Sequence, residues 1–443
     1  MRVLLATASL AGLGGSETYV VTVADHLQRL GHDIWLYTGE RGESSEVAEE
    51  LGLRVLGPDD PPPEDPDVLV VQDGVVACEL AITYPATPQV FVAHSDMFDL
   101  QLPPQLPGLT ALVVALYDRV EARIRALALE HEVVRLTQPV DVERFKPTRP
   151  LPERPRVALT FGNYVHGERL ALLRRGCERA GIELRHVGAH GQSAARRPQE
   201  ALNDADIVFA KARAICEAMA CGRAAYVFDH NGGEGWVTAE SYAWMAADNF
   251  GGQSRPRAVD GETLAADLER YEPSMGIVNR DLAVSHHGAT KHAAALVEVL
   301  RRVAGSQRKP VDAQLDELAR MIRLRHKADA QAFELHVEAE RVGARVNELE
   351  LEAQRLRTEA EQARADASQS QAEAAGARAE TERALVETEH ACAEVARARA
   401  DTEAAWGRFT AVAMSRRWRA VQALMAVADR LRGRPNTRRG QPS

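Results

Sequence analysis

The chain has 443 residues, which is long enough for two or three domains. Hydrophobic residues make up 45% of it but aromatic residues only 5%, so we expect one long segment with little core of its own. The net charge of -10 at pH 7 argues against a nucleic-acid partner. The five cysteines are scattered, which argues against a disulfide framework or a Cys-rich zinc site and favours a reducing, cytoplasmic compartment.

Short apolar runs alternate with amphipathic segments in residues 1–150. The first run, 2–8, also fits a short signal peptide, but a Gly-rich turn and an amphipathic helix over 17–30 follow at once, so we predict a strand. Apolar strands separated by helices indicate a parallel sheet buried on both faces. Further strands are predicted at 33–38, 68–72, 90–94, 112–116 and 132–136.

A proline-rich passage, 139–156, interrupts this pattern and predicts an interdomain hinge, because proline resists both helices and sheets. A second series of strands and helices follows it. We therefore predict an α/β fold of two doubly wound Rossmann-like domains, 1–150 and 151–304, with a cleft at the carboxyl ends of their strands. The second series comprises strands at 157–161, 184–187, 207–210 and 225–229, a helix that ends at 180, and helices at 214–220 and 290–303.

From residue 311 the composition changes to Ala, Glu, Arg and Gln, with almost no Gly or Pro. Apolar residues then alternate four-three spacing from Leu335 to Ala367, which is a heptad seam. A second, shorter seam over 385–395 ends where Arg399 takes the next position. We predict a long α-helical coiled coil over 311–412 that forms a homodimer; the alternative is a solvated single helix.

Residues 413–443 hold eight arginines and a single acid, Asp429, and their apolar residues, which include Trp418, recur at helical spacing. A basic amphipathic helix with a Trp is typical of segments that lie on an anionic membrane surface. The equally supported alternative is a helix that packs on the protein or on a partner. No stretch of the chain reaches the roughly eighteen apolar residues that a membrane-spanning helix needs.

Two positions in the first predicted domain are candidates for ligand contacts. The loop GLGGS, 12–16, joins a strand to a helix, and its Gly14 and Gly15 would let phosphate oxygens approach the helix-start amides. His94 ends the strand in VFVAHSD, where a histidine is able to hydrogen-bond a sugar hydroxyl. The alternatives are an ordinary tight turn and a structural histidine.

A carboxylate stands inside an otherwise apolar stretch of the second predicted domain, ARAICEAMACG. Burying Glu217 without a partner is costly, so we expect it to face a cleft and to accept two ribose hydroxyls. Lys211 and Arg213 precede it and, with helix-start amides, would bind a diphosphate. A second flexible turn, with Gly232 and Gly233, is expected at the same sheet edge; the alternative is an exposed Glu beside an ordinary Gly turn.

Three segments together resemble the family 4 glycosyltransferases, which have the GT-B fold: GGSET at 14–18, QPVDVERFKP at 138–147 and EAMACGRAAYVFDHNGGEG at 217–235. The resemblance covers about residues 1–300. It implies transfer of a sugar from a nucleotide-diphosphate donor, bound mainly by the second domain, to an acceptor bound by the first, without a metal ion. It also implies that Glu217 holds the donor ribose, that Gly14 and Gly15 lie near the phosphates, and that His94 lies beside the transferred sugar.

The sequence departs from the family pattern at two places. Phe209 stands where the family has a second glutamate, and FGNYVHGERL at 161–170 lacks the usual basic pair; Lys211 and Arg213 would replace those cations. The missing glutamate favours an alternative without turnover. We interpret Asp204-Ala-Asp206 as a helix exit before a strand, not as a metal-binding DxD motif.

The favoured interpretation is a hexosyltransferase, retaining as the family implies, that moves a sugar from a nucleotide-diphosphate sugar to a glycan or lipid-linked acceptor in surface polysaccharide or glycoconjugate biosynthesis. We expect it in the cytoplasm, peripheral to the inner face of the cell membrane, with no metal or cofactor. One alternative is a catalytically degenerate GT-B scaffold that acts through its coiled coil, and another is a sugar-nucleotide epimerase. The predicted catalytic residues are His94, Arg213 and Glu217, and the predicted donor-binding residues are Gly14, Gly15, Lys211, Arg213, Glu217, Gly232 and Gly233.

Overall fold

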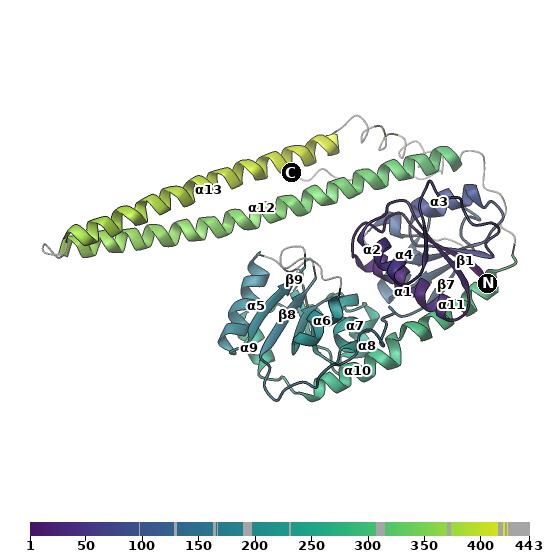
Figure 1. Cartoon of the computed structure of the whole chain (residues 1–443), viewed down its shortest axis with the longest axis horizontal. Helices are drawn as coiled ribbons and strands as arrows, with labels where there is room; N and C mark the ends of the chain where they lie inside the picture. Colours follow the sequence, from purple (N-terminus) through teal and green to yellow (C-terminus); the bar gives the residue numbers. More distant parts are fainter. Residues whose placement is uncertain are drawn as a thin grey trace. The chain divides into compact units, whose positions relative to one another are not determined.

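The chain forms two compact units, Met1–Arg320 and Met321–Ser443 (Figure 1). The first unit contains two β-sheets with their helices, and the second contains most of two long helices. The computed structural model describes residues 1–96, 98–127, 131–162, 165, 167–188, 197–229, 232–306, 315–369, 374–414, 420 and 423.

The first sheet has seven parallel strands in the order β3-β2-β1-β4-β5-β6-β7. Every residue of the central strands β4, β5 and β6 is buried, which is the pattern of a parallel sheet covered on both faces. The strand order reverses between β1 and β4, and this reversal leaves a crevice at their carboxyl ends. The strands are β1 (Arg2–Thr7), β2 (Asp33–Thr38), β3 (Arg54–Leu56), β4 (Val68–Val71), β5 (Gln89–Ala93), β6 (Leu112–Ala115) and β7 (Glu132–Arg135).

Helices connect these strands, and we call the sheet with its helices the first lobe. The longest of them follows the Gly-rich loop, as expected, and begins at Gly15 rather than at residue 17. Asp73 starts another helix, because its carboxylate accepts hydrogen bonds from the amides of Val75 and Val76. The helices are α1 (Gly15–Arg29), α2 (Glu43–Glu50), α3 (Gly74–Thr83), the short 3-10 turn η1 (Asp99–Gln101) and α4 (Asp118–Ala126).

The second sheet has five strands in the order β12-β11-β10-β8-β9, and we call it with its helices the second lobe. Four strands are parallel, and β12 pairs antiparallel with β11. The flexible turn expected at Gly232 and Gly233 is therefore wrong, since both glycines belong to β12. A Cβ on Gly233 would lie 2.8 Å from the carbonyl oxygen of Val227, so only glycine lets the two strands approach so closely. The strands are β8 (Val157–Phe161), β9 (Glu183–Val187), β10 (Ile207–Ala210), β11 (Ala224–Asp229) and β12 (Gly232–Trp236).

Two consecutive helices tie the second lobe back to the first. α10 packs against α7, and α11, separated from it by Gly288 alone, packs against α1 of the first lobe. We call residues 137–141, where the chain passes from the first lobe to the second, the chain crossing. Its Val140 amide donates to the His287 carbonyl (2.7 Å), and its Val140 carbonyl accepts from Ala289 (2.9 Å), so the crossing is bonded to the junction of α10 and α11. The helices are α5 (Gly167–Arg179), α6 (Pro198–Asp204), α7 (Arg213–Ala220), α8 (Tyr242–Ala247), α9 (Gly261–Leu268), α10 (Ser274–His287) and α11 (Ala289–Val303).

The predicted α/β fold with two Rossmann-like sheets is confirmed by this topology. The helix exit predicted at Asp206 is also supported, because its carboxylate accepts from the amides of Arg156 and Val157 and pairs with Arg149, all within the second lobe. Sequence patterns missed the edge strands β3 and β12. β3 has only three residues, and β12 is rich in glycine, so neither shows an apolar run.

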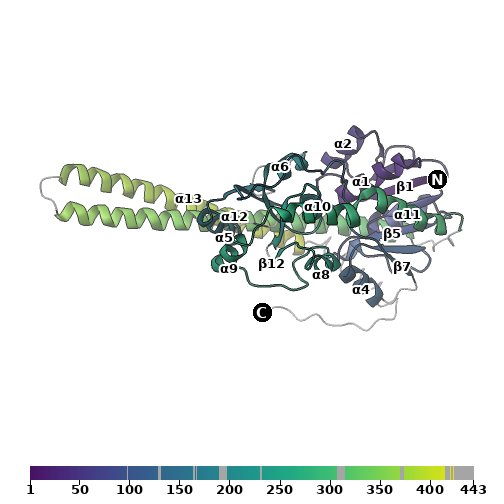
Figure 2. The same ribbon diagram turned by 90° about the horizontal axis from the view of Figure 1, so that it is seen from below.

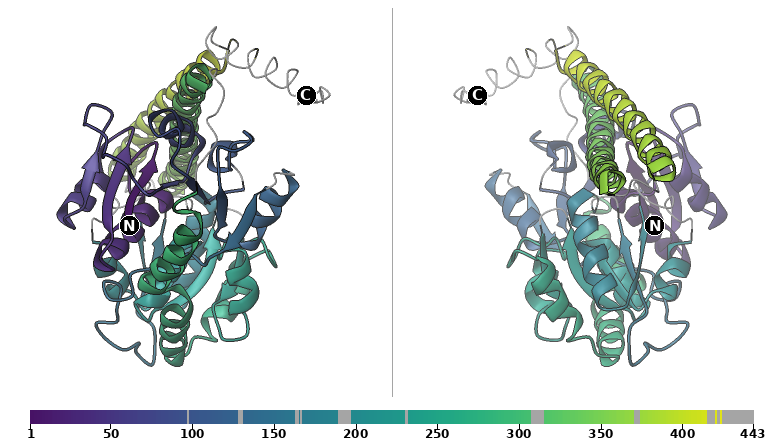
Figure 3. Two further views of the ribbon diagram at one scale, coloured as in Figure 1. Left: turned by 90° about the vertical axis from the view of Figure 1, so that its right-hand side faces the viewer. Right: turned by 90° about the vertical axis from the view of Figure 1, so that its left-hand side faces the viewer.

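The second unit contains the long helices α12 (Leu315–Gln369) and α13 (Ala374–Met414), which run side by side and antiparallel (Figures 1, 2 and 3). Ala353 and Leu356 of α12 pack against Ala391 of α13. Arg399 pairs with Glu350, and Arg408 with Glu338, so charges flank the apolar contact along its length.

The heptad seam of α12 is buried at Ala339, Leu349, Ala353, Leu356 and Ala360. In the structure this seam faces α13 of the same chain; the homodimer expected through it stays a prediction. On α13, burial does not end at Arg399, because Ala405 further along the helix is fully buried. The side chains of seam positions 363 and 367 lie outside the described residues.

The basic tail predicted over 413–443 lies almost entirely outside the described residues, so its amphipathic face stays a prediction. Among the residues that the structure does describe, none of the helices combines the length and the apolar character needed to cross a membrane.

Candidate functional site

A pocket of about 300 Å³ lies between the two lobes. The first two-thirds of α1 and part of α2 form its first-lobe wall, and the residues after β8, β9 and β10 form much of its second-lobe wall. In the second sheet the strand order reverses between β8 and β10, so the pocket lies at the switch point where open α/β sheets bind ligands. Its lining includes Gly14, Gly15, Gly162, Gly188, Lys211 and Glu217.

Glu217 lies in this pocket wall and is only 5% exposed. Its Oε1 accepts a hydrogen bond from Nε of Arg213, one turn earlier on α7, at 2.8 Å. Burial raises the pKa of Glu217, and the charge of Arg213 opposes that rise. The expected position of Glu217, in the cleft and beside Arg213, is confirmed; its contact with a ribose stays a prediction.

Arg213 contacts both lobes. Besides Glu217, its Nη1 donates to the Pro139 carbonyl (2.9 Å) and its Nη2 to Oγ1 of Thr22 on α1 (3.0 Å). The side chain is 8% exposed. Three of the five N–H groups of its guanidinium thus bond protein acceptors, and its contact with a leaving diphosphate, the role that the sequence suggested, stays a prediction.

The turn that brings Lys211 into the pocket wall is only two residues long, between β10 and α7. Ala212 adopts φ 50°, in the region that favours glycine, and its amide donates to the Phe250 carbonyl at 3.0 Å. Backbone strain of this kind is found mostly at ligand sites, where neighbouring contacts hold it. The short turn also leaves Phe209 inside β10.

Gly14 and Gly15 lie at the N-terminus of α1, and both line the pocket. Helix-start amides attract anions. A Cβ on Gly14 would come 2.3 Å from Oε2 of Glu17, so this acidic side chain folds over the helix start, whereas Gly15 faces open space. An anionic ligand here would have to displace the carboxylate of Glu17.

His94 follows β5 as expected but is not among the residues that line the pocket. Its Nε2 lies 2.9 Å from Oε1 of Gln72, and its ring meets the edge of Tyr19 with centroids 4.6 Å apart. Burial, assisted by the charge of Arg213, lowers the pKa of His94 to about 3. His94 is therefore a neutral histidine packed on α1, and its expected place beside the sugar stays a prediction that this placement does not support.

Gly232 and Gly233 do not line the pocket either, because β12 is an edge strand on the far side of β11. The next residue, Glu234, is 8% exposed and accepts the Arg255 amide at 2.7 Å. The donor-binding role predicted for the two glycines has no support from this placement.

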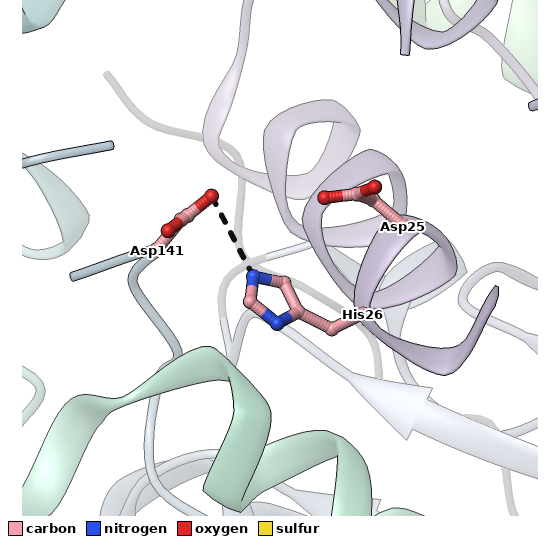
Figure 4. Close-up of side chains that lie close together, drawn as sticks. All are labelled: Asp25, His26 and Asp141. Atoms are coloured by element: carbon pink, nitrogen blue, oxygen red, sulfur yellow. Dashed lines mark ion pairs between the residues drawn. The ribbon is translucent and has the colours of Figure 1, made fainter. Parts of the chain in front are cut away.

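The sequence reasoning missed a polar cluster at the pocket margin: Asp25 and His26 on α1, and Asp141 just after Pro139 (Figure 4). Nε2 of His26 lies 3.6 Å from Oδ2 of Asp141, and Asp25 and Asp141 both line the pocket. Asp141 belongs to the QPVDVERFKP segment, which in the sequence indicated only the family resemblance and no site residue. The available signal was a pair of polar residues on the buried face of α1.

Two buried histidines tie the chain crossing to both lobes. Nδ1 of His287 donates to the Gln138 carbonyl (2.8 Å), and its Nε2 lies 2.9 Å from the hydroxyl of Tyr242 in the second lobe. His292 repeats this geometry with the Thr137 carbonyl (2.9 Å) and the hydroxyl of Tyr19 in the first lobe (2.9 Å). Each ring is thus a hydrogen-bonded link between the crossing and one lobe.

No protein family matches the chain in a family scan, and no curated protein matches it in sequence. Among solved structures, HepE of Anabaena in complex with UDP and glucose has a TM-score of 0.50 and 12% identity, and covers 68% of this chain and 99% of its own. A glycosyltransferase from Rickettsia africae ESF-5 has a TM-score of 0.49, 12% identity, and coverage of 69% and 99%. AviGT4, a glycosyltransferase of avilamycin A biosynthesis, has a TM-score of 0.44, 18% identity, and coverage of 69% and 99%. The likeness to HepE supports the two-lobed GT-B fold, and at this identity the fold alone.

Proposed function

We propose that the chain is a glycosyltransferase that binds a nucleotide-diphosphate sugar in the interlobe pocket. The acceptor is a glycan or a lipid-linked sugar in surface polysaccharide or glycoconjugate biosynthesis, and the transfer retains the anomeric configuration. The resemblance of three motifs to family 4 glycosyltransferases and the fold shared with HepE support this proposal. HepE itself was solved with UDP and glucose.

The observation that carries the proposal is the composition of the pocket wall. A buried carboxylate, Glu217, a cation, Lys211, and the amides at the start of α1 all border one pocket. A ribose needs hydroxyl acceptors, and a diphosphate needs cations and amide donors, so the wall offers both kinds of contact. Gly162 and Gly188, at the ends of β8 and β9, leave room for a planar base.

A second candidate function is a catalytically degenerate scaffold, and Phe209 favours it. Phe209 is fully buried in β10 and packs against Tyr226 and Phe228, with ring centroids 5.2 and 6.4 Å away. Phe209 is not among the residues that line the pocket. The sugar contact that the family's upstream glutamate supplies must therefore come from elsewhere, or it is missing.

Calorimetry with UDP and GDP tests the proposal on the full-length chain. We expect one of the two to bind with a Kd of about micromolar order, and Glu217→Gln to weaken binding by roughly tenfold or more, the cost of a charged hydrogen bond. Gly15→Leu should also block binding, because its side chain would occupy the pocket.

The matched control for the glycine variant is Gly12→Leu, since Gly12 also faces open space but does not line the pocket. Absence of binding by both nucleotides contradicts the enzyme proposal and favours the scaffold. If nucleotide sugars bind and are converted without any acceptor, product analysis identifies an epimerase instead.

The remaining partners belong to the same proposal. We place the protein in the cytoplasm at the inner face of the cell membrane, because a basic tail with a Trp suits an anionic surface. Transfer at the anomeric carbon needs cations and amides at the leaving diphosphate, so no metal is assigned to this reaction. Self-association through α12 and α13 is part of the proposal as well.

A further inference from the structure

The cluster of Asp25, His26 and Asp141 has the composition and spacing of a metal site. One ligand atom from each residue lies within 4.8 Å of the other two. Nε2 of His26 and Oδ2 of Asp141 are 3.6 Å apart, which is long for a hydrogen bond. Two ligands held about 2.1 Å from one tetrahedral ion lie roughly 3.4 Å apart, so the observed separation needs little change.

A buried ring nitrogen of His26 that makes no hydrogen bond to a described residue marks the place of the ion. His26 is 4% exposed, and its Nε2 is buried without a hydrogen-bond partner among the described residues. A hydrogen bond on the other ring nitrogen orients the ring, because Nδ1 lies 3.1 Å from Oγ1 of Thr290 on α11. Such a contact on the other ring nitrogen is the usual way in which a metal-binding histidine is oriented. Figure 4 shows this nitrogen turned towards the carboxylate of Asp141.

The carboxylate of Asp141 is arranged as a ligand, and that of Asp25 lies beside it. Oδ1 of Asp141 accepts the amides of Glu143 and Arg144 at 3.0 Å each, which leaves Oδ2 towards His26. Asp25, 5% exposed, lies beside Asp141, and the half-exposed Arg29 bonds both of its carboxylate oxygens, Oδ1 at 3.1 Å and Oδ2 at 2.7 Å, so an ion would take one of these oxygens from Arg29.

We propose that Asp25, His26 and Asp141 bind one divalent first-row transition-metal ion, of the Zn²⁺ or Mn²⁺ kind, where α1 meets the segment after Pro139. One imidazole and two carboxylates suit such ions, whereas Mg²⁺ prefers oxygen ligands alone. The ion would join the first lobe to the chain crossing. It would also offset two negative charges at the margin of the pocket, without taking part in sugar transfer.

Metal titration of the chelator-treated, full-length chain tests the proposal. We expect one Zn²⁺ per chain, Mn²⁺ in competition with it, and Mg²⁺ at least tenfold weaker. His26→Gln and Asp141→Asn should each weaken Zn²⁺ binding at least tenfold. Co²⁺ should give visible absorption bands in the wild type that His26→Gln abolishes. His390→Gln is the control, because His390 is exposed on α13.

The variants also separate metal binding from folding. Glutamine at position 26 keeps an amide for Thr290, and circular dichroism checks that the fold remains. Should the fold be lost, Asp25→Asn replaces this variant, because asparagine has the same shape and the Arg29 that pairs with Asp25 is half-exposed. Three results would contradict the proposal: no Zn²⁺ binding by the wild type, equal binding by His26→Gln and the wild type, or a loss in His390→Gln as large as that in His26→Gln. Each would show that the cluster is an ion pair only. No nucleotide is used, so failure of the proposed glycosyltransferase function leaves this outcome unaffected.

Discussion

Arg213 and Glu217 form a buried ion pair whose energetic value depends on both partners being present. The side chains are 8% and 7% exposed, so removal of either leaves a charge in a low-dielectric environment. Arg213 also bonds Thr22 and the Pro139 carbonyl, which gives the pair a role in joining the lobes. The pair therefore contributes to both the pocket wall and the interlobe contact.

We expect Arg213→Met to destabilise the first unit by about 3–5 kcal/mol, the usual cost of leaving a buried charge unpaired. The double variant Arg213→Met/Glu217→Leu should recover most of this loss, since neither charge remains. Urea denaturation followed by intrinsic fluorescence measures both. Arg125→Met, which breaks the exposed pair with Glu121, is the control and should cost about 1 kcal/mol or less. Equal losses for the single and double variants would contradict the pairing argument.

The sequence was sufficient to place Glu217, because an isolated carboxylate in an apolar helix requires a partner, and the i,i+4 spacing supplies Arg213. It was insufficient for His94, whose position at a strand end was correct. Its ring turns onto Tyr19, which depends on how α1 packs and has no signature in the sequence. Asp141 was missed for a related reason, because its neighbour His26 is 115 positions earlier in the chain.

At the scale of elements, strands and helices with strong apolar patterns were predictable, and glycine-rich or very short ones were not. β4, β5 and β6 bury all their residues, so each appears in the sequence as a short, continuous apolar run that predicts a buried strand. β12 contains three glycines in five residues and pairs only because β11 lies beside it. On α12 the heptad spacing identified the contact face, but the partner helix is a property of the tertiary structure.

The seam of α12 gives a prediction with an internal control. Leu356 is 6% exposed against α13, whereas Leu351, on the same helix, is 69% exposed. We expect Leu356→Glu to lower the thermal midpoint of the helical signal in the full-length chain, because it buries a charge in place of a side chain worth about 2–5 kcal/mol. Leu351→Glu should leave the midpoint within about a degree.

Sedimentation of the same two variants addresses the homodimer. If wild-type chains associate through the seam, Leu356→Glu will dissociate them and Leu351→Glu will not. If Leu351→Glu alone lowers the sedimenting mass, the chains associate through the outer face of α12, and the seam packs only against α13 of the same chain. A midpoint that falls equally for both variants is incompatible with the packing seen here.

At the scale of the whole molecule, the contact between the lobes is built around neutral histidines. Burial lowers the pKa of His287 and His292 to about 4, and that of His94 to about 3, from an ordinary value of 6.5. His287 and His292 each use one ring nitrogen as a donor to a carbonyl of the chain crossing and the other as an acceptor from a tyrosine. Protonation would convert that acceptor into a donor and, at His292, place a charge near Arg213, which already lowers the pKa of His94 and His292.

The folded chain should therefore lose stability on acidification between about pH 6.5 and pH 4. In that window the unfolded chain binds protons on these histidines and the folded chain does not, so unfolding becomes easier as the pH falls. Above about pH 6.5 their contribution is fully present; that of His287 and His292 is lost by about pH 4, and that of His94 by about pH 3. Thermal midpoints of the full-length chain from pH 7.5 to pH 4.5 should fall by several degrees.

His292→Gln, whose neutral amide replaces both hydrogen bonds, should flatten this dependence, whereas His390→Gln on the exposed face of α13 should leave the slope unchanged. An identical slope in His292→Gln and the wild type would show that carboxylates elsewhere, and not the interlobe histidines, set the acid limit of the fold.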